Sequence, residues 1–307
     1  MDEFELIRRF FRGRPPAAGV LLGPGDDAAL LQPTPGMQLV MTMDTLVAGR
    51  HFPENLPPAD IGWRSLAVNL SDLAAMGADP RWCLLSLSLP SADPVWLESF
   101  CEGFFALADS MGVGLVGGDM VRGPMAVTLQ ACGEVPVGKA LLRSGSRPGD
   151  RICVAGVPGE AAAGLALWQQ GEHEGVLQKV FARPRPQLAL GRQLRGQASA
   201  CIDISDGLLA DLQHLLTESG GLGAELRLDR LPRSLAFDNW ADSDRRRHAQ
   251  LAGGDDYLLL FTLPPIFHLP AEWREIGRVT SQPGLRVYLP DGGLLSPLPQ
   301  GWDHFRH

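Results

Sequence analysis

Hydrophobic and polar positions follow two different spacings along the chain, and each spacing predicts one kind of element. A strict period of two over Leu85-Ser86-Leu87-Ser88-Leu89 is typical of a strand with one buried face. Apolar segments of similar length predict further strands at residues 38–43, 126–132, 151–155 and 257–262. The strands are therefore expected to be short and distributed over the whole chain.

Helical spacing fills the segments between these strands. Leu66, Leu70 and Leu73 keep one face from Trp63 to Gly77. The next helix carries a stripe of apolar side chains, Trp96, Phe100, Phe104 and Leu107. Both stripes are interpreted as core, and the alternation of strands with helices predicts the α/β class.

A polar segment rich in turn residues divides the chain. Residues 143–150, Arg-Ser-Gly-Ser-Arg-Pro-Gly-Asp, come directly before the apolar strand Ile152-Cys153-Val154. The 307 residues suit two domains. We therefore expect domains at residues 1–145 and 146–307.

Composition narrows the class of protein. The 35 acidic and 27 basic residues give a net charge of −8, which argues against a non-specific nucleic-acid binder. The start of the chain lacks the apolar core of a signal peptide, and no apolar run is long enough to span a membrane. The five cysteines are widely spaced and are interpreted as small buried side chains. A cytoplasmic protein is expected.

Aspartates recur beside glycines or at the ends of predicted strands. Each one alone suits a turn or a helix cap. Loops at the carboxyl ends of strands converge in an open α/β sheet, where two charges 4 Å apart would repel by about 4 kcal/mol at an effective dielectric of 20. Cations would then be required, and an all-oxygen ligand set suits Mg²⁺ serving a phosphate-bearing substrate. These aspartates are Asp26, Asp27, Asp44, Asp72, Asp119, Asp203 and Asp206.

Other kinds of chemistry find less support in the sequence. The P-loop, the dinucleotide-binding glycine motif, the EF-hand loop and the Gly-x-Ser-x-Gly elbow are all absent. The turn at residues 156–160 could receive a phosphate at the start of the helix that follows, but this signal is weak alone. His51 is either an ordinary histidine or a substrate contact. Nucleotide phosphoryl chemistry is the leading class.

Several motifs together resemble the thiamine-monophosphate kinase family, within the superfamily of aminoimidazole ribonucleotide synthetase. The resemblance covers essentially the whole chain. It rests on Gly23-Pro24-Gly25-Asp26-Asp27, Asp44-Thr45-Leu46-Val47-Ala48-Gly49 with His51-Phe52, residues 67–78, Gly117-Gly118-Asp119, Arg143-Ser144-Gly145 with Pro148-Gly149-Asp150, Asp203-Ile204-Ser205-Asp206-Gly207 and Gly301-Trp302-Asp303-His304-Phe305.

This resemblance implies roles for individual residues. Several Mg²⁺ ions would be bound by Asp27, Thr42, Met43 through its carbonyl, Asp44, Asp72, Asp119, Asp203 and Asp206. ATP would contact Gly118, Asp119, Arg143 and Ser205, and thiamine monophosphate would contact His51, Asp255 and Trp302. Asp72, Asp119 and Asp206 would carry the catalysis. The family usually has glutamate at position 255, so the shorter Asp255 requires a water or a backbone shift at that contact.

The resemblance also implies the fold and the reaction. The fold is a two-domain one with mixed sheets, in which an N-terminal domain binds Mg-ATP and forms a homodimer and a C-terminal α/β domain completes the active site. The reaction is direct, Mg²⁺-dependent phosphorylation of thiamine monophosphate by ATP, the last step of thiamine diphosphate biosynthesis. The alternatives are another ATP-dependent synthetase of the superfamily and a non-catalytic Mg-nucleotide sensor.

Overall fold

The chain folds into two compact units in the computed structural model, which describes residues 3–302. Unit 1 comprises Met1–Leu73 and Ala78–Gly138, and unit 2 comprises Ala74–Gly77 and Lys139–His307. Asp303, His304 and Phe305 of the last motif lie outside the described residues. No helix in the described part of the chain combines the length and the apolar character that a membrane crossing requires.

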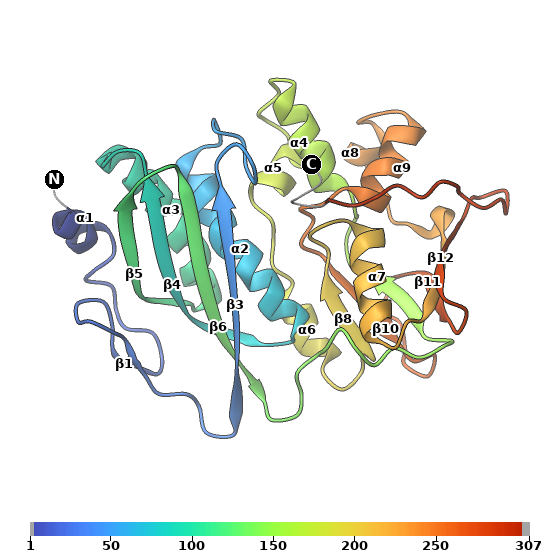
Figure 1. Ribbon diagram of the computed structural model, residues 1–307, viewed down its shortest axis with the longest axis horizontal. Helices are drawn as coiled ribbons and strands as arrows, with labels where there is room; N and C mark the ends of the chain where they lie inside the picture. Colours follow the sequence, from blue (N-terminus) through green and yellow to red (C-terminus); the bar gives the residue numbers. More distant parts are fainter. Residues whose placement is uncertain (1–2, 303–307) are drawn as a thin grey trace. The chain divides into compact units, whose positions relative to one another are not determined.

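Unit 1 is a four-stranded sheet covered on one side by two long helices (Figure 1). Its strands run in the order β3-β6-β4-β5, and β4 and β5 form the parallel pair while the other pairs are antiparallel. The elements are α1 (Glu3–Phe10), β1 (Val20–Leu22), β2 (Leu30–Leu31), β3 (Met37–Val47), α2 (Pro58–Ala75), β4 (Asp79–Leu89), α3 (Pro94–Met111), β5 (Gly114–Arg122) and β6 (Ala126–Pro136).

Helices α2 and α3 pack closely because a glycine on each faces the backbone of the other. A Cβ on Gly62 of α2 would lie 2.1 Å from the carbonyl oxygen of Phe100, and one on Gly103 of α3 would lie 1.7 Å from that of Ala59. The apolar stripes predicted for these helices are buried, with Leu66, Leu70, Leu73, Phe100, Phe104 and Leu107 at 0% exposure. The predicted core role is confirmed for these six side chains, whereas Trp96, the first residue of the stripe on α3, is half-buried.

The sequence also sets where α3 begins and ends. The Asp93 carboxylate accepts hydrogen bonds from the N–H groups of Val95 and Trp96, and Pro94 occupies the first turn. At the other end, Gly112 takes the left-handed conformation, with a φ of 68°. These local signals fix the helix against the sheet.

Unit 2 is a six-stranded mixed sheet with helices packed against it (Figure 1). The strand order is β12-β9-β11-β7-β10-β8, in which only the β12 and β9 pair is parallel. The elements are β7 (Arg151–Val154), α4 (Glu160–Gln169), α5 (Val176–Ala182), α6 (Leu188–Leu194), β8 (Ala200–Asp203), α7 (Leu208–Glu218), β9 (Gly223–Arg227), the 3₁₀ turn η1 (Leu228–Arg230), α8 (Leu235–Asp238), α9 (Ser243–Ala252), β10 (Leu259–Leu263), β11 (Arg274–Thr280) and β12 (Gly284–Tyr288).

The main core of unit 2 lies between α7 and the sheet. Leu208, Leu212 and Leu215 of α7 are fully buried together with Ile202 of β8 and Leu260 of β10. Four of the five cysteines are buried, and burial raises the pKa of the Cys83, Cys101 and Cys153 thiols to about 12. The thiols therefore behave as core side chains, as the sequence predicted.

Candidate active site

Three of the predicted metal-binding residues of unit 1 lie together where β3 faces α2. Thr42 and Asp44 are two residues apart on β3, so their side chains point to the same face of the sheet. The Thr42 hydroxyl donates a hydrogen bond of 2.5 Å to Oδ2 of Asp72, which lies on α2. Asp44 and Asp72 also interact, so the cluster holds two carboxylates and one hydroxyl.

The two carboxylates of this cluster repel each other. Burial and, to a smaller extent, the neighbouring Asp72 carboxylate together raise the pKa of Asp44 to about 6. Both oxygen groups would be stabilised by a cation between them. Asp44 and Asp72, with the Thr42 hydroxyl, are therefore a fitting set of oxygen ligands for Mg²⁺.

The position of Asp44 and Asp119 within their strands differs from the prediction. Both were expected where a strand ends, but β3 continues to Val47 and β5 continues to Arg122. The pairing of β3 with β6 continues past Asp44 through the β-branched residues Thr45 and Val47. On either side of Asp119, Gly118 and Met120 both pair with β4. The prediction of strand ends at these two acids was wrong.

Strand register separates Asp119 from the Asp44 cluster. Asp44 pairs with Leu129, which pairs with Leu85, and Leu85 pairs with Gly118 across the sheet. Asp119 is one residue further along, so its side chain points to the opposite face from that of Asp44. The two acids lie at opposite edges and on opposite faces of the sheet.

The open face of the sheet carries the remaining predicted residues of unit 1. A hollow of about 1170 Å³ is lined by Asp27, Met43, Gly118 and Asp119, among other residues. Gly25 precedes the Asp26-Asp27 pair with a φ of 137°, and Arg12 donates to the carbonyl oxygen of Pro24 in the same turn. The structure therefore brings Asp27, Gly118 and Asp119 to one hollow.

His51 is held by the turn that follows β3. Its Nδ1 accepts a hydrogen bond of 3.0 Å from the backbone N–H of Val47, and the backbone N–H of His51 donates to the Val47 carbonyl oxygen. The neutral imidazole consequently carries its proton on Nε2. His51 is thus oriented as a donor through Nε2.

The predicted residues of unit 2 gather at one edge of its sheet. Asp203 ends β8 and pairs with Leu259, which begins β10. Because β8 and β10 are antiparallel, the loop after Asp203 lies beside the segment that leads into β10. This antiparallel pairing, rather than a set of parallel strands, brings residues 203–207 and 253–257 together.

Backbone hydrogen bonds connect these two segments and the end of the described chain. Asp255 N–H donates to the Ser205 carbonyl oxygen at 2.9 Å, and Tyr257 N–H donates to that of Ile204 at 2.8 Å. Trp302 N–H donates to the carbonyl oxygen of Asp206 at 2.9 Å. Four predicted site residues, Ser205, Asp206, Asp255 and Trp302, therefore meet at one loop.

The backbone at Asp255 takes an unusual conformation. Asp255 and Tyr257 have φ values of 69° and 52°, in the left-handed region that side chains rarely adopt. The Tyr257 hydroxyl donates to Asp255 Oδ1 at 3.1 Å, which orients that carboxylate. Strained residues of this kind cluster at functional sites.

A carboxylate that the sequence analysis did not single out organises the Ser205 loop. Oδ2 of Asp211 accepts hydrogen bonds from three consecutive N–H groups, those of Ser205, Asp206 and Gly207, at 3.0, 3.1 and 3.1 Å. Burial raises the pKa of Asp211 to about 8, together with the charges of Asp203 and Asp206. Helix α7 begins after Gly207, so neither Ser205 nor Asp206 is its N-cap.

The turn at residues 156–160 is closed in a similar way. Asp256 accepts hydrogen bonds from the N–H groups of Gly159 at 2.6 Å and Ala161 at 3.2 Å, at the start of α4. Burial raises the pKa of Asp256 well above its usual range, and these two amides act against that rise. Because a carboxylate already occupies this helix N-terminus, the expectation that it could receive a phosphate is not supported.

The predicted boundary segment is tied to unit 2. The Arg143 carbonyl oxygen accepts from the Ser219 hydroxyl at 3.3 Å, and the same hydroxyl accepts from the Ser146 N–H at 3.1 Å. The Ser146 hydroxyl lies 2.9 Å from that of Thr262 on β10. The Arg143 backbone is thus fixed, and its side chain is exposed.

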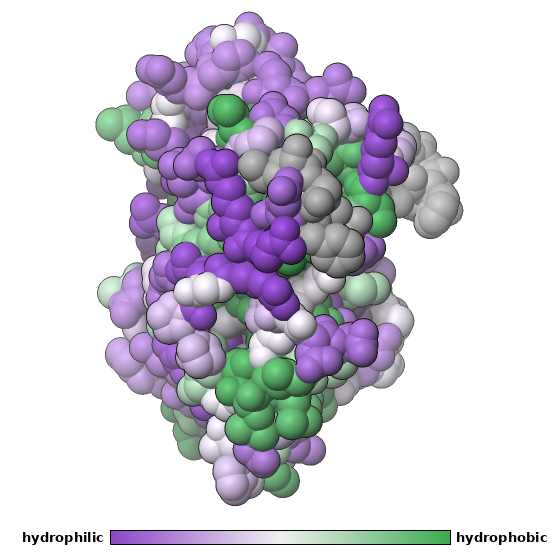
Figure 2. Space-filling view, turned by 90° about the vertical axis from the view of Figure 1, so that its left-hand side faces the viewer, coloured by the Kyte–Doolittle hydropathy of each residue, from purple (hydrophilic) through white to green (hydrophobic). Residues whose placement is uncertain are grey.

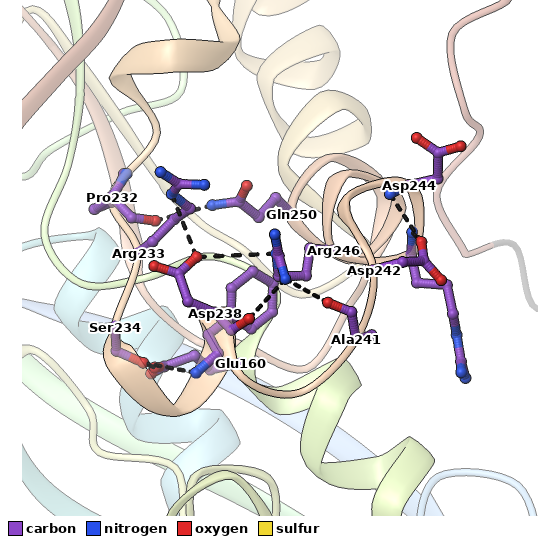
Figure 3. A network of polar contacts seen from close by, with 12 residues as sticks. Glu160, Pro232, Arg233, Ser234, Asp238, Ala241, Asp242, Asp244, Arg246 and Gln250 are labelled. Carbon is purple, nitrogen blue, oxygen red and sulfur yellow. Dashed lines mark hydrogen bonds and ion pairs between the residues drawn. The ribbon is translucent and has the colours of Figure 1, made fainter.

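The acidic segment before the three consecutive arginines is structural. Asp242 caps α9 by accepting from the N–H groups of Asp244 and Arg245, both at 2.9 Å. Figure 3 shows Arg246 reaching back to the Asp238 carbonyl oxygen, at 2.6 Å, and to that of Ala241. Arg246 thus links α9 to the end of α8.

At this site, each metal ion would be bound by only a few protein ligands. Among residues 3–302, no three His, Cys, Asp or Glu side chains are grouped as a metal site. Mg²⁺ is usually held by one or two carboxylates and completes its coordination with water and substrate phosphates. The carboxylate pair of Asp44 and Asp72 fits that mode.

Comparison with known proteins places these residues in a family. The model of the AIR synthase related protein N-terminal domain matches residues 25–135, and that of the C-terminal domain matches residues 147–253. The thiamine-monophosphate kinase of Escherichia coli strain K12 is 42% identical over 319 residues, covering 99% of this chain and 98% of that protein.

Solved structures agree with this match. The thiamine-monophosphate kinase of Stenotrophomonas maltophilia K279a is 44% identical, with a TM-score of 0.85 over 96% of this chain and 98% of that chain. The structure of AaThiL complexed with AMPPCP and TMP is 30% identical, with a TM-score of 0.81 over 98% of this chain and 96% of that chain. The chain combines the aspartate motifs with a two-domain, mixed-sheet fold and with sequence identity to these proteins over its full length. It belongs to the thiamine-monophosphate kinase family.

Proposed function

We propose that the chain transfers the γ-phosphoryl group of ATP to the phosphate of thiamine monophosphate, forming thiamine diphosphate and ADP. Membership of the family supports this reaction, and the AaThiL complex with AMPPCP and TMP supports both ligands. The observation that carries the proposal within this chain is the Asp44 and Asp72 pair with the Thr42 hydroxyl. The synthetase and sensor alternatives are not favoured by these relatives.

The acceptor needs little activation. A phosphate monoester has a second pKa near ~6, so at neutral pH its oxygen is already an anionic nucleophile. That oxygen forms a bond to the γ-phosphorus while the bond from the γ-phosphorus to the bridging β,γ-oxygen breaks and ADP leaves. No protein group has to accept a proton.

The difficulty of the reaction is bringing two polyanions together. Mg²⁺ would supply charge neutralisation when bound. In unit 1 we assign its ligands to Asp27, Thr42, the Met43 carbonyl, Asp44, Asp72 and Asp119, and in unit 2 to Asp203 and Asp206. Asp72, Asp119 and Asp206 are the carboxylates we assign to catalysis, and Asp119 would hold a different ion from that of Asp72 because the two lie on opposite faces of the sheet.

The remaining residues are assigned to the two substrates. Gly118, Asp119, Arg143 and Ser205 would contact ATP, and the exposed Arg143 guanidinium suits a phosphate. His51 Nε2, Asp255 and Trp302 would contact thiamine monophosphate. Tyr257 orients the Asp255 carboxylate, and a water would extend the reach of this side chain, which is shorter than the glutamate that the family usually has.

Trp302 provides a test of the substrate assignment. Its side chain is 40% exposed, and its backbone is fixed to Asp206, so one part of the indole is available for stacking on a cationic thiazolium ring. A cation–π contact is worth about 0.5–2 kcal/mol. We expect Trp302→Ala to raise KM for thiamine monophosphate by about tenfold and Trp302→Phe to raise it less.

Steady-state release of ADP with each substrate varied in turn measures this effect. KM for ATP should stay within twofold of the wild-type value in both variants. Equal increases in both KM values would instead assign Trp302 to packing.

We also propose that unit 1 forms a homodimer through the open face of its sheet. This face exposes apolar side chains from β3 and from β4, the two strands on either side of β6, including Leu39 at 49%, Met41 at 60%, Met43 at 64% and Leu84 at 39%. Figure 2 shows a further group of apolar side chains in its lower half, at the level where β1 lies in Figure 1. Exposed apolar patches of this kind mark interaction surfaces.

A charge on this face tests the dimer. We expect the wild type to have about twice the 33.1 kDa mass of one chain in light scattering, and Leu39→Lys to shift the mass toward that of one chain. Ile266→Lys is the matched control, because Ile266 is 88% exposed on a turn of unit 2. A Leu39→Lys protein that keeps the wild-type mass would exclude this face as the interface.

A further inference from the structure

Three consecutive backbone N–H groups of unit 2 point to one place, at the start of α7. Consecutive N–H groups arranged in this way form a nest, a concave site that ordinarily binds an anion such as phosphate. Here the nest is occupied by the chain itself, because Asp211 Oδ2 accepts from Ser205, Asp206 and Gly207 at 3.0–3.1 Å. Asp211 is 2% exposed, so this carboxylate is removed from solvent.

The occupied nest determines what the loop offers to a ligand. With its three N–H groups bound to Asp211, the loop offers the half-buried side chain of Asp206 instead of these donors, and Asp203, at the end of β8, is 4% exposed. A phosphate has no preformed cradle at this helix N-terminus. Ligands with phosphates would need a cation at this loop, in keeping with the Mg²⁺ roles proposed for the two acids.

The same loop is the anchor for the substrate residues. Its carbonyl groups accept hydrogen bonds from the N–H groups of Asp255, at Ser205, and of Trp302, at Asp206, both at 2.9 Å. The N–H groups of Ser205 and Asp206 are held by Asp211, and their carbonyl groups hold the two substrate residues. Asp211 thus fixes the loop that positions both the proposed metal ligands and the proposed substrate-binding residues.

We propose that Asp211 is a positioning residue that fixes the Ser205–Gly207 loop, so that metal binding by Asp203 and Asp206 and substrate binding by Asp255 and Trp302 both depend on it. This inference rests on the roles proposed above for those four residues. Asp211 itself touches neither substrate nor metal.

Two substitutions separate the shape of Asp211 from its acceptor oxygens. Asp211→Asn keeps the size and one acceptor oxygen, but it places an NH₂ group, which can only donate, beside the N–H groups of the loop. Asp211→Ala removes the acceptor and leaves three N–H groups without their partner. The loss should therefore be larger in Asp211→Ala.

The expected readout is a coupled change in two binding parameters. Replacing residues that orient metal ligands costs about 10–100-fold in metal affinity or activity. We expect Asp211→Asn to raise the Mg²⁺ concentration that gives half of the Mg²⁺-dependent rise in Tm, and KM for thiamine monophosphate, by about tenfold each, with a smaller fall in kcat. Kinetics are measured at least 15 °C below each variant's Tm, so the fraction folded is the same.

Controls on the same helix and the same loop decide the outcome. Glu218→Gln changes an exposed acid of α7 and should leave both parameters within twofold of wild type. If Asp206→Asn shifts the Mg²⁺ dependence while a folded Asp211→Asn protein matches wild type, the positioning role is overturned. If Asp206→Asn leaves the Mg²⁺ dependence unchanged, the proposed metal role of the loop fails instead.

Discussion

We expect the Asp72→Asn protein to lose about a thousandfold in turnover while keeping its fold. Asp72 lies on α2 and accepts the Thr42 hydroxyl, and its charge faces that of Asp44. An amide in its place keeps the shape of the side chain but supplies only one neutral oxygen to a cation. The cation that would balance the charge of the two polyanions is therefore bound less tightly at the cluster.

Stability distinguishes a loss of chemistry from a loss of folding. Without metal, the two carboxylates repel, so the metal-free Asp72→Asn protein should melt at the same temperature as metal-free wild type or higher. Glu102→Gln on α3 is the control, because it changes an exposed acid of the same unit and should keep wild-type turnover. Near-normal turnover by Asp72→Asn would remove Asp72 from the catalytic residues.

Removal of divalent cations should abolish ADP release completely, and addition of Mg²⁺ should restore it. The assay uses ATP with thiamine monophosphate, thiamine or formylglycinamidine ribonucleotide as the acceptor, each with and without Mg²⁺. We expect turnover only with thiamine monophosphate and Mg²⁺. Turnover with the ribonucleotide would favour the synthetase alternative, and ATP binding without any turnover would favour the sensor.

The stability of the metal-free protein should also depend on pH through Asp44. Its pKa is raised from 3.8 to about 6 in the folded protein, chiefly by burial and then by Asp72. Between these values the folded state holds a proton that the unfolded state has lost, so stability falls as pH rises toward about 6. Saturating Mg²⁺ should remove most of this fall, because a bound cation replaces the proton.

Melting temperatures from pH 4 to 7.5, with and without Mg²⁺, measure this effect. Asp44→Asn is the matched variant, and its metal-free melting temperature should fall less than that of wild type over the same range. If the wild type and Asp44→Asn show the same pH dependence, Asp44 does not have the raised pKa that the structure gives it.

The sequence predicted those features that depend on local periodicity. The leucines of α2 and the aromatic stripe of α3 repeat at helical spacing, so their burial could be inferred from spacing alone. The closeness of Thr42 to Asp72 could not, because the two are 30 residues apart and meet only when α2 packs on the sheet. Motif resemblance, rather than spacing, brought Thr42 into the prediction.

Strand ends and supporting acids were harder to predict. Asp44 and Asp119 look like the ends of apolar runs, but pairing with neighbouring strands continues past both, and pairing partners are not visible in one segment. Asp211 lies among the buried leucines of α7, four residues after Gly207, and the leucine spacing alone does not separate it from an ordinary polar position. The signal that could have identified it is an acid in the first turn of a helix that follows a glycine-containing loop.

The occupied helix N-termini of unit 2 have a consequence for inhibitor design. Asp256 accepts from two N–H groups at the start of α4 and Asp211 accepts from three in the loop before α7, so these five donors are not available to an anion. Compounds that imitate a bare phosphate would meet carboxylates at the Asp206 loop. A metal-chelating group that brings its own Mg²⁺ is the better starting point for a compound aimed at that loop.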